Sequence, residues 1–299
     1  MPATFRPSFQ LPIPYNGAFR KRVQGIFTDI CENLAKLARV QTAQSLARVV
    51  DARVVARREP AAGVVVLDVR APAIAAAAGP GQFVMAVPPS AGDTSVALGV
   101  YDVAEDCLSL LFVVVGDRTR RLAALHPGEM LSLFGPLGNG FDLGAGANDV
   151  AIVAGGVGIA SVLLAARALL RRGSRVRLFY GAATAARLVD RERFAAAGCE
   201  VVVATDDGSE GTEGFVTDAL ARAAPADLIL ACGPTAMLHA TAHAAHAMRV
   251  PAQLSLEETF GCGVGACWGC VVPVASENGV AYARVCREGP VFLAEELRW

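Results

Sequence analysis

Four cysteines near the end of the chain have a spacing that can bind iron. Cys262, Cys267 and Cys270 follow the pattern C-x4-C-x2-C, and Cys286 follows later. This spacing is typical of a [2Fe–2S] cluster, in which each iron takes two thiolates. Glycines between the cysteines allow the backbone to curl around a small object and bring N–H groups near the sulfurs. We therefore predict that these four residues are the metal ligands of a [2Fe–2S] cluster.

Two other kinds of site use cysteines in this way, a structural zinc site and disulfide pairs. Zinc knuckles usually contain C-x2-C twice, and the cluster motif contains it once, at Cys267 and Cys270. The chain has eight cysteines, of which four lie in the motif. This usage favours a reducing compartment, and we expect a cytoplasmic protein.

A second candidate site is the glycine-rich segment Ala154-Gly-Gly-Val-Gly158, between an apolar run and a helical pattern. Such a loop presents backbone N–H groups and the positive end of a helix to a pyrophosphate. The spacing differs from G-x-G-x-x-G, so a tight structural turn is the alternative. Cys232-Gly-Pro234 ends a later apolar run, where a small thiol would suit the edge of a nicotinamide pocket.

The composition limits the possible classes of function. The chain has 299 residues, of which 54% are hydrophobic and 18% charged, so it is long enough for two or three domains. Its net charge of −1 argues against a role in binding nucleic acid. The most apolar run, 150–166, is too short and too rich in glycine for a membrane span. We expect neither nucleic acid nor a membrane as partner.

The pattern of the chain predicts four segments: an N-terminal helical arm, an antiparallel β-barrel, a doubly wound parallel sheet and a cysteine-bearing appendage. Apolar residues at helical spacing run from Ala18 to about Val50, with a basic patch at the start of this helix. The helix either folds back on the body or grips another subunit. The expected boundaries are 1–50, 51–147, 148–250 and 251–299.

Within the parallel-sheet segment, apolar runs alternate with helical patterns. We expect strands at 150–154, 175–180, 200–205 and 227–232, and helices at 159–170, 185–197, 216–223 and 235–248.

Together these features resemble the ferredoxin–NADP reductase superfamily, and within it the electron-transfer subunits of class 1B dihydroorotate dehydrogenases. The resemblance runs from about Arg53 to the C-terminus. Besides the cluster motif, it is carried by Pro80-Gly-Gln-Phe83, Gly135-Pro-Leu-Gly-Asn-Gly-Phe141, Ala154-Gly-Gly-Val-Gly158, Thr205-Asp-Asp-Gly208, Gly214-Phe-Val-Thr-Asp218, Ala231-Cys-Gly-Pro234, Leu256-Glu-Glu258 and Val285-Cys-Arg-Glu-Gly-Pro-Val-Phe292.

The resemblance implies an oxidoreductase subunit with three cofactors: NAD(H) as substrate, FAD on the barrel and the cluster. It also implies a partner, an FMN-containing dehydrogenase catalytic subunit of pyrimidine biosynthesis, in a hetero-tetramer. The implied FAD contacts are Thr94, Ser95, Val96, Ala97, Leu111, Phe112, Val113, Arg118 and Thr119. The implied NAD contacts are Gly155, Gly156, Gly158, Cys232, Gly233 and Pro234.

One motif departs from the family. Members carry Arg-Pro-x-Ser/Thr on a barrel strand, with the Arg on the FAD pyrophosphate. An ungapped alignment places that motif at Thr94-Ser-Val-Ala97, which lacks the arginine, the proline and the last hydroxyl. An uncompensated pyrophosphate in a partly dry site is costly. The arginines at 118, 120 and 121 could supply the charge. Alternatively, the affinity for flavin is reduced, or the site is vacant and the chain has only a structural or single-electron role.

Three functions remain open from the sequence. The first is electron transfer to or from a dihydroorotate dehydrogenase; the second is an NAD(P)H reductase subunit for a ferredoxin or a hydrogenase. The third is a flavin-free assembly or regulatory subunit. The choice between NAD and NADP is also open, because Arg187 lies near the second expected strand but is not placed by the pattern. Asp206-Asp-Gly208 is either a simple turn or a contact to the adenosine ribose.

Overall fold

The computed structural model describes residues 46–88, 95–144 and 146–299, which all belong to one compact unit. The predicted N-terminal arm therefore lies outside the described residues, apart from its last positions. Those positions differ from the prediction, because residues 48–50 are extended and open the first barrel strand. In the described residues, no helix has both the length and the apolar character needed to span a bilayer.

The first part is a closed antiparallel barrel, as predicted. Its strands are joined in the order β1-β2-β5-β4-β3-β6. They are β1 (Arg48–Ala61), β2 (Val64–Arg70), β3 (Phe83–Val87), β4 (Val96–Ala104), β5 (Cys107–Val113) and β6 (Met130–Leu137), with short helices α2 (Pro72–Ala75) and α3 (Asp117–Ala123).

Alternating side chains fill the barrel. In the β2–β5 pair, Val65 faces Phe112 and Leu67 faces Leu110 across the ladder, and all four side chains are buried in one core cluster. Residues between them in the sequence point to the other face. This period of two explains why the apolar runs form strands here.

The second part is a parallel sheet with strand order β10-β9-β8-β7-β11-β12-β15. Its strands are β7 (Asp149–Gly155), β8 (Arg175–Ala182), β9 (Glu200–Thr205), β10 (Thr212–Glu213), β11 (Leu228–Cys232), β12 (Ala252–Ser255) and β15 (Val291–Leu293). Its helices are α4 (Leu163–Arg171), α5 (Arg191–Ala197), α6 (Val216–Arg222) and α7 (Thr235–Met248). Only β15 runs antiparallel to its neighbour among these pairs.

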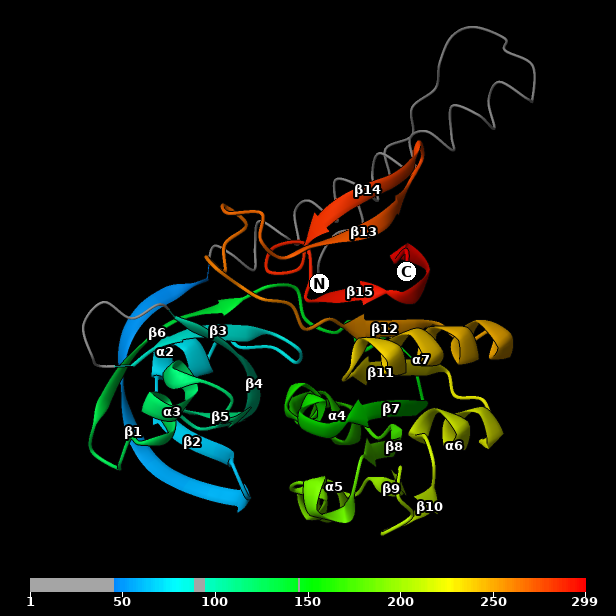
Figure 1. Cartoon of the computed structure of the whole chain (residues 1–299), viewed down its shortest axis with the longest axis horizontal. Helices are drawn as coiled ribbons and strands as arrows, with labels where there is room; N and C mark the ends of the chain where they lie inside the picture. Colours follow the sequence, from blue (N-terminus) through cyan, green and yellow to red (C-terminus); the bar gives the residue numbers. More distant parts are fainter. Residues whose placement is uncertain (1–45, 89–94, 145) are drawn as a thin grey trace, which may run out of the picture. The chain divides into compact units, whose positions relative to one another are not determined.

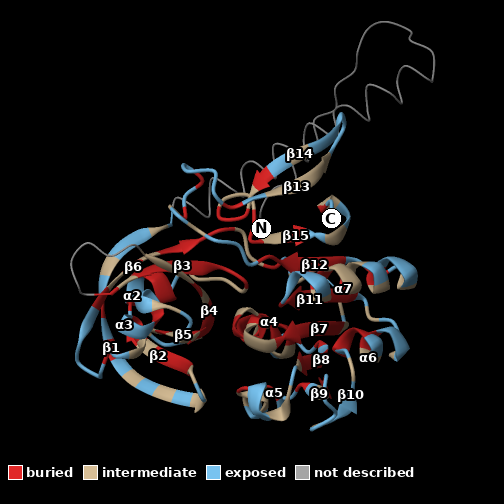
Figure 2. Cartoon of the chain, in the orientation of Figure 1, coloured by how far each residue is buried: buried red, intermediate tan, exposed pale blue. Residues whose placement is uncertain are grey.

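Both faces of this sheet are covered. Val150, Ile152 and Ala154 of β7 belong to one core cluster with α4 and α5, while Ala151 and Val153 belong to another with α6 and α7. Figure 1 shows the two pairs of helices on opposite faces, and Figure 2 shows β7 and β8 buried between them. The doubly wound parallel sheet predicted from the sequence is confirmed.

Two predicted helices are wrong in detail. The one expected at 159–170 begins as a 3₁₀ turn, Gly156–Ser161, and becomes α-helical at Leu163. The one expected at 185–197 is interrupted before α5, because Asp190 has the left-handed value φ 53°. The N–H of Val189 in this break donates to the Tyr180 hydroxyl at 3.0 Å.

The C-terminal residues extend the sheet and add a hairpin. Strands β12 and β15 lie at the sheet edge, and the antiparallel hairpin β13 (Val271–Ser276) and β14 (Gly279–Arg284) stands between them in sequence. A short 3₁₀ helix, Ala294–Glu296, follows β15. Asn139, just after β6, is tied to this region, since its N–H donates to the Gly289 carbonyl at 2.6 Å.

Ion pairs join the barrel to the parallel-sheet part. Asp102 of β4 is 2% exposed and accepts hydrogen bonds from Arg167 of α4 at 2.7 and 2.9 Å. Arg193 of α5 donates to the same carboxylate at 2.7 Å. A buried carboxylate with two guanidinium partners holds these elements in one arrangement.

A second carboxylate, Asp190, faces the barrel from the other side. It accepts hydrogen bonds from Arg58 of β1 at 2.7 Å and from the Tyr101 hydroxyl of β4 at 2.8 Å. Burial alone would raise the pKa of Asp190, but the hydrogen bonds from Arg58 and Tyr101 lower it below its usual value. The two carboxylates fix how the barrel faces the sheet edge.

Candidate functional site

The cysteine loop, which we define as residues 261–270, brings the predicted ligands together in two pairs. Cys262 is paired with Cys267, whose N–H donates to the Cys262 sulfur, and Cys270 is paired with Cys286, whose N–H donates to the Cys270 sulfur. Among the described residues, no three His, Cys, Asp or Glu side chains converge on one point as in a single-ion site. Four thiols in two pairs match the ligand set of a two-iron cluster.

Backbone N–H groups of the loop point at the sulfurs. Those of Ala266 and Cys267 donate to the Cys262 sulfur at 3.2 and 3.4 Å, and that of Cys286 donates to the Cys270 sulfur at 3.4 Å. Hydrogen bonds of this kind stabilise thiolates and tune the potential of a bound cluster.

These contacts shift the thiol pKa values in opposite directions. Partial burial would raise the pKa of Cys262, but hydrogen bonds from the N–H groups of Val264, Cys267 and Ala266 lower it to about 6. Burial, with the neighbouring Cys270 thiol, raises the pKa of Cys286 to about 12. Iron binding requires all four groups as thiolates.

Small residues make room for the sulfurs and for the barrel. A Cβ added at Gly261 or Gly269 would lie 3.3 or 3.5 Å from the Cys267 sulfur. Gly263 has φ +71°, and a Cβ there would lie 2.7 Å from the Met85 sulfur of β3. The cysteine loop therefore lies directly against a barrel strand.

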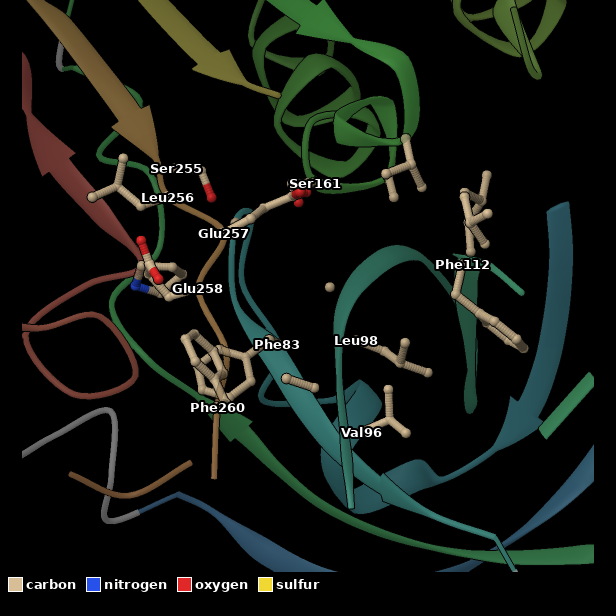
Figure 3. Close-up of a pocket in the computed structure, with 18 of the residues that line it drawn as sticks. Phe83, Val96, Leu98, Phe112, Ser161, Ser255, Leu256, Glu257, Glu258 and Phe260 are labelled. Atoms are coloured by element: carbon tan, nitrogen blue, oxygen red, sulfur yellow. The ribbon is translucent and has the colours of Figure 1, made fainter. Parts of the chain in front are cut away.

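A cavity of about 350 Å³, which we call the barrel cavity, lies between β3, β4 and β5 of the barrel and the edge of the parallel sheet. Its size is that of a small cofactor site. Figure 3 shows Phe83 and Phe260 together on one wall, Val96 and Leu98 of β4 beside them, and Ser161 and Glu257 on the sheet side. Most of the lining is apolar.

Six of the predicted FAD contacts line the barrel cavity. They are Val96, Ala97, Leu111, Phe112, Val113 and Thr119. Ser95 and Arg118 stand next to each other outside the lining, since the Arg118 guanidinium donates to the Ser95 carbonyl at 3.0 Å. Thr94 lies outside the described residues.

Thr119 organises the turn before α3. Its hydroxyl accepts the N–H groups of Val115 and Gly116 at 3.0 and 3.1 Å and donates to the Gly116 carbonyl. This arrangement brings Arg118 to the start of β4, where the family motif carries its arginine. The residues present therefore fit a flavin, with Arg118 as the cation nearest the altered motif.

Sequence reasoning missed several lining residues of the barrel cavity. Phe83 and Phe260 pack ring to ring at 4.9 Å, and Ser161, Ser255 and Glu257 come from the sheet edge. They are far apart in the sequence and share no spacing. Pro80-Gly-Gln-Phe83 and Leu256-Glu-Glu258, two motifs of the family resemblance, were the available signals.

Cys232 connects β11 to the barrel cavity. Its side chain is fully buried, and its sulfur lies 3.8 Å from the Glu257 carboxylate. Burial, together with the Glu257 charge, raises the pKa of Cys232 to about 12, so this thiol stays protonated at neutral pH. It is a small neutral group at the end of β11, in contact with a residue of the barrel cavity wall.

A second cavity, of about 650 Å³, lies at the carboxyl edge of the parallel sheet, and we call it the sheet-edge cavity. Gly155, Gly156 and Pro234 of the predicted NAD contacts line it, together with residues that follow β8 and β9. The carboxyl edge is where parallel sheets bind ligands. The site therefore fits a dinucleotide.

The other predicted NAD contacts lie behind this lining. A Cβ at Gly158 would come within 2.3 Å of the Cys232 carbonyl oxygen, and one at Gly233 within 2.9 Å of the Gly155 nitrogen. Gly158, Cys232 and Gly233 thus allow the two loops to approach closely, so that the glycine-rich turn can open onto the cavity.

Comparisons with known proteins identify two of these parts. Residues 257–298 match the iron-sulfur cluster binding domain of dihydroorotate dehydrogenase B, and residues 152–243 match the oxidoreductase NAD-binding domain. The dihydroorotate dehydrogenase B (NAD(+)) electron transfer subunit of Geobacillus kaustophilus is 41% identical over 225 residues, covering 73% of this chain and 86% of that protein. The chain belongs to this family.

The wider comparisons agree with the assignment to the electron transfer subunits. The corresponding subunit of Desulforamulus reducens is 33% identical over 264 residues, covering 85% of this chain and all of that protein. A solved structure of an NADH-dependent reduced ferredoxin-NADP oxidoreductase is 31% identical, with a TM-score of 0.74, and covers 83% of this chain and 90% of that one. The ferredoxin reductase of carbazole 1,9a-dioxygenase is 25% identical, with a TM-score of 0.60, and covers 68% and 67%.

Proposed function

We propose that this chain passes electrons between NAD(H) and a partner catalytic subunit, through FAD in the barrel cavity and a [2Fe–2S] cluster in the cysteine loop. FAD, when bound, converts two-electron hydride chemistry into the single-electron chemistry of the cluster. The chain itself binds these groups, keeps them in line and excludes water from the space between them.

One observation carries the proposal: a single cavity touches both neighbouring sites. Val157 and Ser161 of the 3₁₀ turn that follows Gly155 line the barrel cavity, and so does Phe260, two residues before Cys262. A flavin in this cavity would thus lie beside the dinucleotide loop and beside the cysteine loop.

The proposed partner is an FMN-containing dihydroorotate dehydrogenase subunit, in a cytoplasmic hetero-tetramer. The names of the relatives support this partner. An exposed face at the cysteine loop supports electron exit there, because Cys267 is exposed and Trp268 is 56% exposed beside it. The guanidinium of Arg284 lies 4.6 Å from the centre of the Trp268 ring and holds it in place.

The experiment compares Cys286→Ser with the matched control Cys107→Ser in the full chain, purified without air together with its partner. We expect about two iron atoms per chain in the wild type and in Cys107→Ser, and a large loss in Cys286→Ser. Cys286→Ser should still oxidise NADH with a dye that takes electrons from flavin, but should no longer reduce the partner. Full electron transfer to the partner without iron would refute the relay.

The identity of the partner is tested by co-purification. We expect a catalytic subunit that releases FMN on denaturation and whose dihydroorotate oxidation reduces this chain. A ferredoxin or hydrogenase subunit in its place would contradict the assignment.

A further inference from the structure

The sheet-edge cavity carries two opposite charges that the proposed function has not used. Of the described residues that line it, Arg187 and Asp206 are charged, and both are exposed; most of the others are small or apolar. In a dinucleotide pocket, a carboxylate can bind the ribose 2′-hydroxyl of NAD, and a cation can bind the 2′-phosphate of NADP. The inference below rests on NAD(H) binding in this cavity.

The order of the strands decides which end of the dinucleotide meets these charges. The nicotinamide must reach the barrel cavity, and that cavity lies on the β11 side, where Cys232 contacts Glu257. Gly155, the last residue of the central β7, and Gly156 after it line the cavity and would face the pyrophosphate. Asp206 follows β9, on the other side of β7 in the strand order β9-β8-β7-β11. The adenosine therefore lies toward Asp206 and Arg187.

In dinucleotide-binding folds, a carboxylate at the end of the second strand usually receives the ribose 2′-hydroxyl. Here that strand is β8, and it ends in Gly181 and Ala182 with Ala183 following, none of which has a carboxylate. The N–H of Asp206 donates to the carbonyl of Ala182 at 3.1 Å. The next strand thus brings a carboxylate to the place that β8 leaves without one.

We propose that Asp206 is the specificity-determining residue for NAD(H) over NADP(H), and that Arg187 opposes it. The Asp206 carboxylate accepts a hydrogen bond from the ribose hydroxyl, whereas a 2′-phosphate would bring like charges together. Arg187, from the short turn Ala185–Arg187, would favour that phosphate once the carboxylate is neutral. One uncharged substitution should therefore shift the preference.

Asp207 provides a matched control. It is adjacent to Asp206, but its carboxylate accepts hydrogen bonds from the N–H and the hydroxyl of Ser209 at 3.0 and 2.6 Å. It is not among the residues that line the sheet-edge cavity. Asp206→Asn and Asp207→Asn each remove one negative charge from the same turn, so they separate a local contact from a general charge effect.

The experiment measures, by calorimetry on the full chain, the affinities for adenosine 5′-monophosphate and adenosine 2′,5′-bisphosphate, which differ by the 2′-phosphate. We expect the wild type to prefer the first ligand. Asp206→Asn should shift the ratio of affinities toward the bisphosphate by about fivefold. The effect is moderate because the Asp206 and Arg187 side chains are both exposed to solvent. Adding Arg187→Ala to Asp206→Asn should remove that gain, and Asp207→Asn should leave the ratio unchanged. The ratio of kcat/KM for NADH and NADPH should follow the same order.

Each of the other possible results would contradict one part of the proposal. An unchanged ratio in Asp206→Asn, with 5′-monophosphate still bound, refutes the role of Asp206, and so does an equal shift in Asp207→Asn. A gain that survives Arg187→Ala refutes the role of Arg187. If the wild type binds neither adenosine ligand nor NADH, the proposed function fails, and this inference fails with it.

Discussion

At the scale of single residues, the flavin site depends on how the chain replaces a missing arginine. The segment that would carry the family motif ends in Ser95, Val96 and Ala97, which offer no cation to a pyrophosphate. Arg118 extends from α3 to the Ser95 carbonyl, so its charge lies next to this segment. Arg120 is on the same short helix but pairs with Asp117 instead.

Arg118→Ala should therefore weaken FAD binding, while Arg120→Ala should not. A charge-assisted contact to phosphate in an open site contributes about 1 to 2 kcal/mol, so we expect roughly a five- to thirtyfold rise in the FAD dissociation constant. The measurement is the flavin-to-protein ratio after gel filtration, followed by fluorescence titration with FAD. Equal FAD affinity in the two variants would show that the pyrophosphate is neutralised elsewhere.

The residues of the cluster site could be predicted from spacing, whereas the rest of the cavity wall could not. The spacing of the four cysteines is itself typical of [2Fe–2S] ligands, and the structure places them in two pairs. Phe260 and Phe83 meet only because β3 passes under the segment after β12, which no local pattern encodes. The contact of Cys232 with Glu257 is of the same kind.

At the scale of elements, apolar periodicity predicted the barrel and the sheet because both form by burying the apolar side chains of their strands. β9 and α7 begin and end where the sequence indicated. The errors lie where a single backbone position overrides the pattern. Asp190 adopts φ 53° and breaks a helical run, so that its carboxylate can accept bonds from Arg58 and Tyr101. Strand β15 was also missed, because its partner β12 lies far away in the sequence.

The contacts between α4, α5 and the barrel give a prediction about elements. Asp102 is buried and accepts bonds from Arg167 and Arg193, whereas Asp106, on the same barrel, is partly exposed and pairs with Arg70. Asp102→Asn leaves two guanidinium groups without their charge partner. Both are about one-third exposed, so solvent reduces the loss, and we expect the free energy of unfolding to fall by about 2 kcal/mol.

Urea denaturation of the full chain measures this loss, with Asp106→Asn as the control, for which we expect a much smaller loss because its ion pair with Arg70 is open to solvent. Asp102→Asn should also raise the KM for NADH, because the 3₁₀ turn and α4 that carry the dinucleotide loop pack on β4. Equal stabilities of the two variants would mean that the Asp102 ion pairs do not stabilise the contact between the barrel and the sheet.

At the scale of the whole described molecule, the three sites form one continuous series. Cys232 lies two residues before Pro234, which lines the sheet-edge cavity, and its sulfur contacts Glu257, which lines the barrel cavity. Phe260, also in the wall of the barrel cavity, lies two residues before Cys262 of the cysteine loop. Strand β3 contacts the region of the cysteine loop at two points, because Phe83 packs on Phe260 and Met85 packs on Gly263. Strand β3 therefore helps to set the position of the cysteine loop relative to the cavity.

Phe260 is thus a positioning residue for the cysteine loop, and its replacement should affect one step of electron transfer and not the other. Phe260→Leu removes the ring contact with Phe83 while keeping an apolar side chain. Phe112→Leu is the matched control, since Phe112 lines the same cavity from β5, across from Phe83 and Phe260 in Figure 3. The two variants lose similar apolar volume, so a difference between them reports on position rather than on cavity size.

In stopped-flow mixing with NADH, the loss of flavin absorbance reports the first step and the loss of cluster absorbance the second. Phe260→Leu should slow the second step several-fold and leave the first unchanged, because Ser161, next to the dinucleotide loop, lies on the sheet side of the cavity, away from Phe83 and Phe260. The spin-resonance spectrum of the reduced cluster should also change in Phe260→Leu and stay unchanged in Phe112→Leu, since it senses the surroundings of the sulfurs. If both variants slow both steps equally, the effect comes from flavin binding, and the cysteine loop holds its position without the aromatic pair.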